Sequence, residues 1–140
     1  MKIAYQALFK QDNHGVFVHF PDLAEAHTDG KTMAEALFNA EEVLNLTLEA
    51  RMEENMDIPE PQEHEGGIWI YPTPQVQAAL LVRFARHGRS LADLARALGT
   101  SWPSAQRLED PKASPNLRQL NKAAQALGKR LVLSFEPLQQ

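Results

Sequence analysis

Residues 90–108 read Ser90-Leu-Ala-Asp-Leu-Ala-Arg-Ala-Leu-Gly-Thr-Ser-Trp-Pro-Ser-Ala-Gln-Arg-Leu108. A helix-turn-helix needs a small residue where its two helices cross, a tight turn soon afterwards, and apolar anchors on both helices. Ala95 lies four residues before Gly99, which can adopt a positive φ at the turn. The stretch therefore predicts two short helices, at about 91–98 and 102–108, joined by a tight turn.

This interpretation assigns DNA binding to the second of these helices. In a helix-turn-helix, that helix lies in the major groove with its N-terminal residues near the base edges. Glutamine and arginine can make bidentate contacts with bases, and lysine and arginine neutralise phosphates. The predicted DNA-binding residues are Ser90, Ser101, Trp102, Ser104, Gln106, Arg107, Lys112 and Arg118. Two roles remain open for Trp102: contact with a thymine methyl group, and packing onto the protein. The alternative for the whole stretch is a helical hairpin with a solvated basic face.

Helical periodicity continues on both sides of this stretch and then gives way to alternation. Further helices are predicted at about 75–87 and 116–127, so the second half resembles the Cro/repressor type of DNA-binding domain. Leu131, Leu133 and Phe135 alternate with other residues and predict a final strand. A lone strand leaves backbone groups unpaired, and pairing with its twin across a two-fold axis would satisfy them. These three residues are the predicted dimerisation segment; the alternative is docking onto the N-terminal sheet.

The first half predicts a small α/β unit. Apolar residues alternate in two stretches that favour a hairpin, and Thr32 with Glu35 matches a capping box that opens an amphipathic helix. The predicted elements are strands over 2–9 and 16–20, a loop up to residue 31, a helix from about 33 to 52, and a short strand over 68–71. The helix is expected to cover one face of the hairpin.

The 140 residues carry a formal net charge of −4 that is unevenly divided. Residues 1–74 hold four Lys and Arg against fourteen Asp and Glu, a net of −10, whereas residues 75–140 hold ten against four, a net of +6. Such asymmetry indicates two modules with different partners, 1–74 and 75–140. The alternatives are chance and mutual neutralisation of the two halves.

Several function classes are disfavoured by what the sequence lacks. Without cysteine there is no disulfide framework, thiol zinc site or cysteine nucleophile. No run of apolar residues is long enough to span a membrane, and no signal peptide is apparent, so a cytoplasmic protein is expected. A two-metal nuclease needs clustered carboxylates, but the predicted strands 2–9 and 16–20 contain none. We therefore expect no catalytic residues, no metal site and no cofactor.

The order of these features resembles the HicB antitoxins of bacterial toxin–antitoxin pairs. The resemblance rests on Phe20-Pro21-Asp22-Leu23 after the hairpin, Thr28-Asp29-Gly30-Lys31-Thr32-Met33-Ala34-Glu35-Ala36 at the start of the helix, Asp57-Ile58-Pro59-Glu60-Pro61 after it, and the helix-turn-helix. It implies a reduced ribonuclease-H-like α/β domain that binds and blocks a small basic ribonuclease, HicA. It also implies that the C-terminal domain represses the operon that encodes both proteins.

Within this resemblance, the second face of the hairpin is the predicted toxin contact. Phe17 and His19 share that face, unless Trp69 and Tyr71 fold back over them. The predicted toxin-binding residues are Phe17, His19, Asp22, Glu25 and Asp29. One rival function is a free-standing DNA-binding regulator whose first domain senses a small molecule. A second rival is a weak nuclease.

Overall fold

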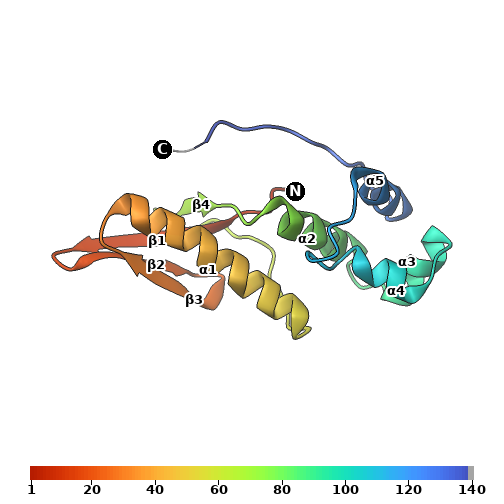
Figure 1. The fold of residues 1–140 in the computed structure, drawn as a ribbon, viewed down its shortest axis with the longest axis horizontal. Coiled ribbons are helices and arrows are strands. Elements are labelled where there is room, and N and C mark those ends of the chain that lie inside the picture. Colours follow the sequence, from red (N-terminus) through yellow and green to blue (C-terminus); the bar gives the residue numbers. More distant parts are fainter. Residues whose placement is uncertain (139–140) are drawn as a thin grey trace. The chain divides into compact units, whose positions relative to one another are not determined.

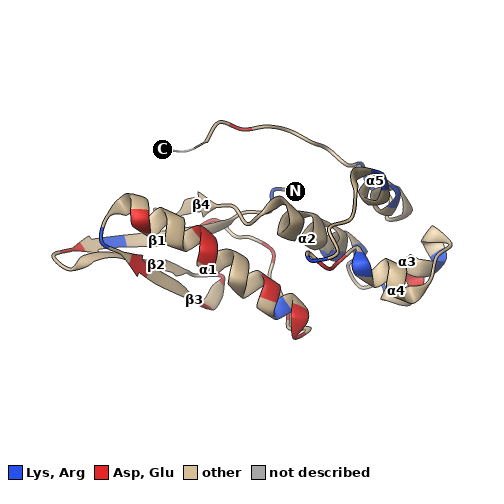
Figure 2. Cartoon of the chain, in the orientation of Figure 1, with Lys and Arg blue, Asp and Glu red and all other residues tan. Residues whose placement is uncertain are grey.

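The computed structural model describes residues 1–138, which form two compact units, Met1–Leu81 and the residues from Val82 onward. The elements are β1 (Tyr5–Asp12), β2 (Gly15–Phe20), β3 (Leu23–Gly30), α1 (Met33–Glu53), β4 (Ile68–Ile70), α2 (Pro74–Arg86), α3 (Leu91–Leu98), α4 (Trp102–Arg107) and α5 (Leu117–Ala126) (Figure 1). Helix α2 contributes residues to both units, and the predicted domain boundary lies at its first residue. Acidic residues gather on the first unit and basic residues on the second (Figure 2).

The first unit contains a four-stranded antiparallel sheet with the strand order β3-β2-β1-β4. The hairpin of β1 and β2 and the short strand β4 confirm the sequence prediction. The loop predicted after β2 is wrong, because Leu23–Gly30 forms the edge strand β3, paired with β2. This strand has mostly small or polar residues, and a bulge at His19 and Phe20 interrupts its register, so the sequence shows no clean alternation.

Helix α1 covers one face of this sheet, as predicted (Figure 1). Thr32 caps it by accepting a hydrogen bond from the Glu35 backbone N–H at 3.2 Å. The buried residues of the helix are Ala36, Ala40, Leu44, Thr47 and Leu48, and they face buried Val16, Val18 and Phe20 of β2. Gly30 lets β3 and the first turn of α1 approach closely, since a Cβ at this position would collide with the Ala36 backbone. Apolar burial between helix and sheet thus stabilises this unit.

The segment between α1 and β4 is held by polar contacts with Tyr5 of β1 and with Asp22, which lies between β2 and β3. The Tyr5 hydroxyl donates to the Pro59 carbonyl at 2.6 Å, and burial raises the pKa of this phenol. The Asp22 carboxylate accepts from the Gln62 backbone N–H at 3.0 Å and lies 2.7 Å from Nε2 of His64. Because the Asp22 side chain is only 7% exposed, it acts as an anchor for this segment.

The Glu25–Arg51 ion pair joins β3 to the end of α1 and predicts a specific acid sensitivity. Two hydrogen bonds of 2.7 Å from Arg51 lower the pKa of Glu25 from 4.5 to about 2. A carboxyl group whose pKa is lower in the folded state stabilises the fold at neutral pH, and this contribution disappears as the pH falls through the folded pKa. We expect Glu25→Gln to lower the free energy of unfolding by about 0.5–1 kcal/mol near neutral pH, as for other exposed pairs.

Urea denaturation of the wild type and Glu25→Gln across the acid range measures this contribution. The difference between the two proteins should shrink as the pH falls from 4.5 to about 2. The comparison removes the effects of all other carboxyl groups, because both proteins share them. A difference that stays constant down to the lowest pH would contradict the assignment.

The second unit is a small helical domain whose four helical segments confirm the predicted periodicity. Its core consists of Val82, Leu94, Ala95, Ala105, Leu108, Ala123 and Leu127. The strand predicted at Leu131, Leu133 and Phe135 does not form in the single chain, where the described residues after Gly128 have no regular structure. The reason is physical: an extended segment becomes a strand only when another strand pairs with it. Among the helices of residues 1–138, none is long and apolar enough to cross a membrane.

Candidate functional site

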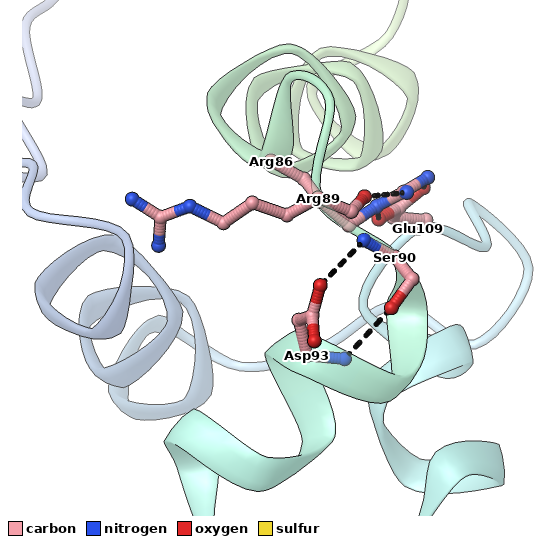
Figure 3. Close-up of polar contacts among 5 residues, drawn as sticks. All are labelled: Arg86, Arg89, Ser90, Asp93 and Glu109. Carbon is pink, nitrogen blue, oxygen red and sulfur yellow. Dashed lines mark hydrogen bonds and ion pairs between the residues drawn. The ribbon is translucent and has the colours of Figure 1, made fainter.

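Helix α3 of the second unit begins at a complete capping box (Figure 3). The Ser90 hydroxyl accepts from the Asp93 backbone N–H at 3.0 Å, and the Asp93 carboxylate accepts from the Ser90 N–H at 3.2 Å. These bonds with Ser90 lower the pKa of Asp93, so the cap is ionised at neutral pH. Ser90, predicted from sequence as a DNA-binding residue, therefore has a structural role in the free protein.

The capping role makes Ser90→Ala a test of stability. We expect this variant to lose about 1 kcal/mol in free energy of unfolding, the typical cost of removing a serine N-cap. Chemical denaturation followed by circular dichroism measures the loss. Ser90→Asn is the matched control, because asparagine caps helices about as well as serine and should retain the stability. If Ser90→Ala were as stable as the wild type, the hydroxyl would not support the helix.

The turn between α3 and α4 consists of residues 99–101. Gly99 has a φ of 65°, in the left-handed region where glycine carries no steric penalty. Its backbone N–H donates to the Arg96 carbonyl, and that of Thr100 donates to the Ala95 carbonyl at 2.9 Å. Ala95 and Ala105 are both buried in the same core, so small side chains lie where the two helices approach. The structure thus contains two short helices joined by a three-residue turn.

Helix α4 presents an exposed face of mixed chemistry. Ser101 caps it by accepting from the Ser104 backbone N–H at 3.3 Å, and its hydroxyl also lies 3.0 Å from that of Ser104. Trp102 is 47% exposed, and Gln106 and Arg107 are exposed. On the following loop and α5, Lys112 and Arg118 are exposed as well. Of the residues predicted to bind DNA, Trp102, Gln106 and Arg107 share one helix and face solvent.

Arg86, at the end of α2, has a structural role that sequence reasoning missed. Its guanidinium donates to both carboxylate oxygens of Glu109, at 2.6 and 3.0 Å, and to the Arg89 carbonyl at 2.6 Å (Figure 3). The hydrogen bonds with Glu109 raise the pKa of Arg86. The pair ties the end of α2 to the segment after α4. The side chain of Arg89 extends away from it.

A second exposed surface is the face of the sheet opposite α1. Strand register places Lys10, Phe17 and Asp29 in one row across β1, β2 and β3, and Leu8, His19 and His27 in the next. These side chains line an open hollow of about 840 Å³. Phe17 is 45% exposed at its centre, on the middle strand of the three. We call these six residues the open sheet face.

The structure brings together three of the five residues predicted to contact a toxin. Phe17, His19 and Asp29 belong to the open sheet face. Asp22 is buried against His64, and Glu25 is bound by Arg51, so both have partners within the unit. These two residues serve the fold, whichever face binds a partner.

The comparisons with known proteins agree on one family. Residues 4–76 match the model of the HicB-like antitoxin of bacterial toxin–antitoxin systems. Antitoxin HicB 2 of Photorhabdus laumondii is 33% identical over 130 residues, covering 92% of this chain and 94% of that protein. The chain belongs to the HicB antitoxin family. Antitoxin HicB 1 of the same organism is 32% identical over 87% of this chain and 79% of its own length, and Antitoxin HicB of Escherichia coli K12 is 31% identical over 85% and 88%.

The toxin-binding residues predicted from the sequence of this antitoxin include only part of the open sheet face. His27 was missed because residues 23–30 were interpreted as a loop, whereas β3 places His27 directly opposite His19. Leu8 and Lys10 were missed because the predicted contact face included residues of β2 but none of β1. Had β3 been recognised, alternation along the three strands would have identified the whole set.

The solvent side of α1 is a further exposed surface of the antitoxin. Phe38 and Leu46 are 60% and 67% exposed. Helical geometry places Glu35, Glu42 and Glu49 between or beside them, because residues at spacings of three, four and seven share a face. The sequence predicted an amphipathic helix, but the apolar residues on its solvent side were not recognised.

Proposed function

We propose that the first unit of this antitoxin binds and occludes a HicA-like toxin, a small basic ribonuclease that cleaves mRNA, and that the second unit binds operator DNA. The observation that carries the proposal is the family membership: the family model matches residues 4–76 of the first unit, and the similarity to Antitoxin HicB 2 covers 92% of the chain and so extends into the second. In this proposal the sheet and α1 form a reduced ribonuclease-H-like domain, and α3 with α4 forms a helix-turn-helix. Occlusion of the toxin's RNA site requires no chemistry from the antitoxin.

The open sheet face is the proposed toxin contact. Phe17 offers an exposed aromatic ring beside Leu8, and aromatic residues are common energetic centres of interfaces. The net charge of −10 on residues 1–74 would attract a basic partner and speed its association. Polar groups at the edge of the hollow, His19, His27 and Asp29, would fix the orientation of the toxin.

The exposed face of α4 is the proposed DNA contact. Gln106 and Arg107 are suited to base edges, and Lys112 and Arg118 to phosphates. We further propose that two chains associate through Leu131, Leu133 and Phe135; Leu133 and Phe135 are exposed in the single chain and Leu131 is partly buried, and all three would then be covered. A two-fold dimer presents two recognition helices to a palindromic operator, with half-sites about 34–36 Å apart. Binding there would repress the operon of the antitoxin and its toxin.

The proposal can be tested by a pull-down of the antitoxin from its native host, with bound proteins identified by mass. We expect one small basic protein encoded beside the antitoxin, and we expect the purified pair to bind the DNA that precedes its operon. Recovery of no such protein would reject the toxin-binding function. Recovery of DNA alone would favour a free-standing regulator whose first unit binds another ligand.

A further inference from the structure

Trp102 is an exposed indole at a position where the fold of the second unit does not require one. It is the first residue of α4, and its side chain is 47% exposed. The residues that α4 and its C-cap bury in the core are Ala105 and Leu108. Of the two roles left open by the sequence, packing onto the protein is therefore incomplete, since the residue remains 47% exposed.

The backbone beneath Trp102 is fixed on both sides. Ser101 caps the helix through its hydrogen bond with the Ser104 N–H, and Pro103, in the first turn, restricts its own φ to helical values. A side chain on a fixed backbone loses little additional freedom on binding, which favours recognition by the ring. Gln106 lies four residues later, so it shares a face of the helix with Trp102.

The chemistry of an indole limits what it can recognise in the major groove. Its ring is apolar, and its one polar group, Nε1–H, only donates. The apolar feature of the major groove is the 5-methyl group of thymine, whereas a glutamine amide matches the N6 and N7 atoms of adenine. Trp102 and Gln106 together therefore fit a site containing A·T pairs.

We infer that Trp102 is a specificity-determining residue that recognises the 5-methyl group of thymine in the operator. This inference rests on the DNA-binding function proposed above and deepens it. It assigns the ring to base recognition and leaves the phosphates to Lys112 and Arg118. Removal of the thymine methyl groups should therefore weaken binding, and only when Trp102 is present.

The experiment compares two DNA duplexes that differ only in methyl groups. One has the sequence that precedes the operon of the antitoxin, and the other has uracil in place of every thymine, which keeps all hydrogen-bonding groups. Fluorescence anisotropy at a fixed salt concentration gives the affinity of the full-length chain for each duplex. The wild type should bind the thymine duplex about fourfold more tightly for each methyl group that it buries. Trp102→Ala should bind the two duplexes equally.

Leu117→Ala is the matched control variant. Leu117 is also the first residue of a helix, α5, and is 59% exposed, so its removal tests the loss of any exposed apolar side chain. This variant should keep the preference for thymine. Equal binding of the wild type to both duplexes, or the same preference in Trp102→Ala as in the wild type, would overturn the inference while leaving DNA binding intact. Failure of the wild type to bind the thymine duplex would overturn the DNA-binding function itself, and the inference with it.

Discussion

Replacing Arg107 with alanine should weaken operator binding by about 1–3 kcal/mol, or roughly 5- to 150-fold, and should leave toxin binding unchanged. Arg107 is exposed at the end of α4, close to Gln106 and outside the core of the second unit. Truncating an arginine that contacts a base removes its hydrogen bonds with that base and its favourable charge interaction with the DNA. Because the residue is exposed and lies outside the core, the variant should fold normally.

Electrophoretic mobility shifts on a series of operator variants measure this effect. If Arg107 contacts a base, its replacement should remove the protein's preference for one base pair. If it contacts a phosphate, its replacement should weaken binding equally for all sequences. Arg130→Ala is the control, since it removes an exposed arginine outside the helices. Its sequence preference should equal that of the wild type. If Arg107→Ala abolished both DNA and toxin binding, the two activities would not be divided between the two units.

Two arginines of the second unit have different roles that the sequence alone does not distinguish. Arg86 and Arg107 are both cations near the end of a helix, and nothing in the sequence around them shows that their roles differ. Only the fold shows that the turn after α4 brings Glu109 to Arg86, while Arg107 stays exposed. Pairing between residues far apart in the chain leaves no periodic signal, so charge patterning alone cannot separate the two roles.

The same distinction explains which elements the sequence predicts well. Helices α1, α3 and α5 have N-cap residues and apolar stripes within a single local stretch. Strand β3 depends on hydrogen bonds with β2, and its own residues have low strand propensity. The final apolar alternation at 131–135 shows the opposite case, since the pattern is present and no strand pairs with it in the single chain. Local patterns therefore predict helices reliably, but a strand depends on its partner.

The first unit has two candidate surfaces for toxin binding, the open sheet face and the outer face of α1, and mutations can distinguish between them. Each contains one exposed phenylalanine, Phe17 at 45% and Phe38 at 60%, and the two lie on opposite sides of the sheet and helix. Both faces are accessible to a partner. The acidic residues beside Phe38 would favour a basic toxin, whereas Phe17 lines an open hollow together with Leu8.

Phe17→Ala should weaken toxin binding by about 2 kcal/mol or more, roughly 30-fold, as expected for an aromatic residue at the centre of an interface. Phe38→Ala should change the affinity much less, and neither variant should lose much stability, because both rings are exposed in the free antitoxin. Isothermal titration calorimetry with the purified toxin gives both affinities, and thermal unfolding verifies the fold. If Phe38→Ala weakened binding and Phe17→Ala did not, the toxin contact would be the acidic outer face of α1. In that case the open sheet face would need a different partner.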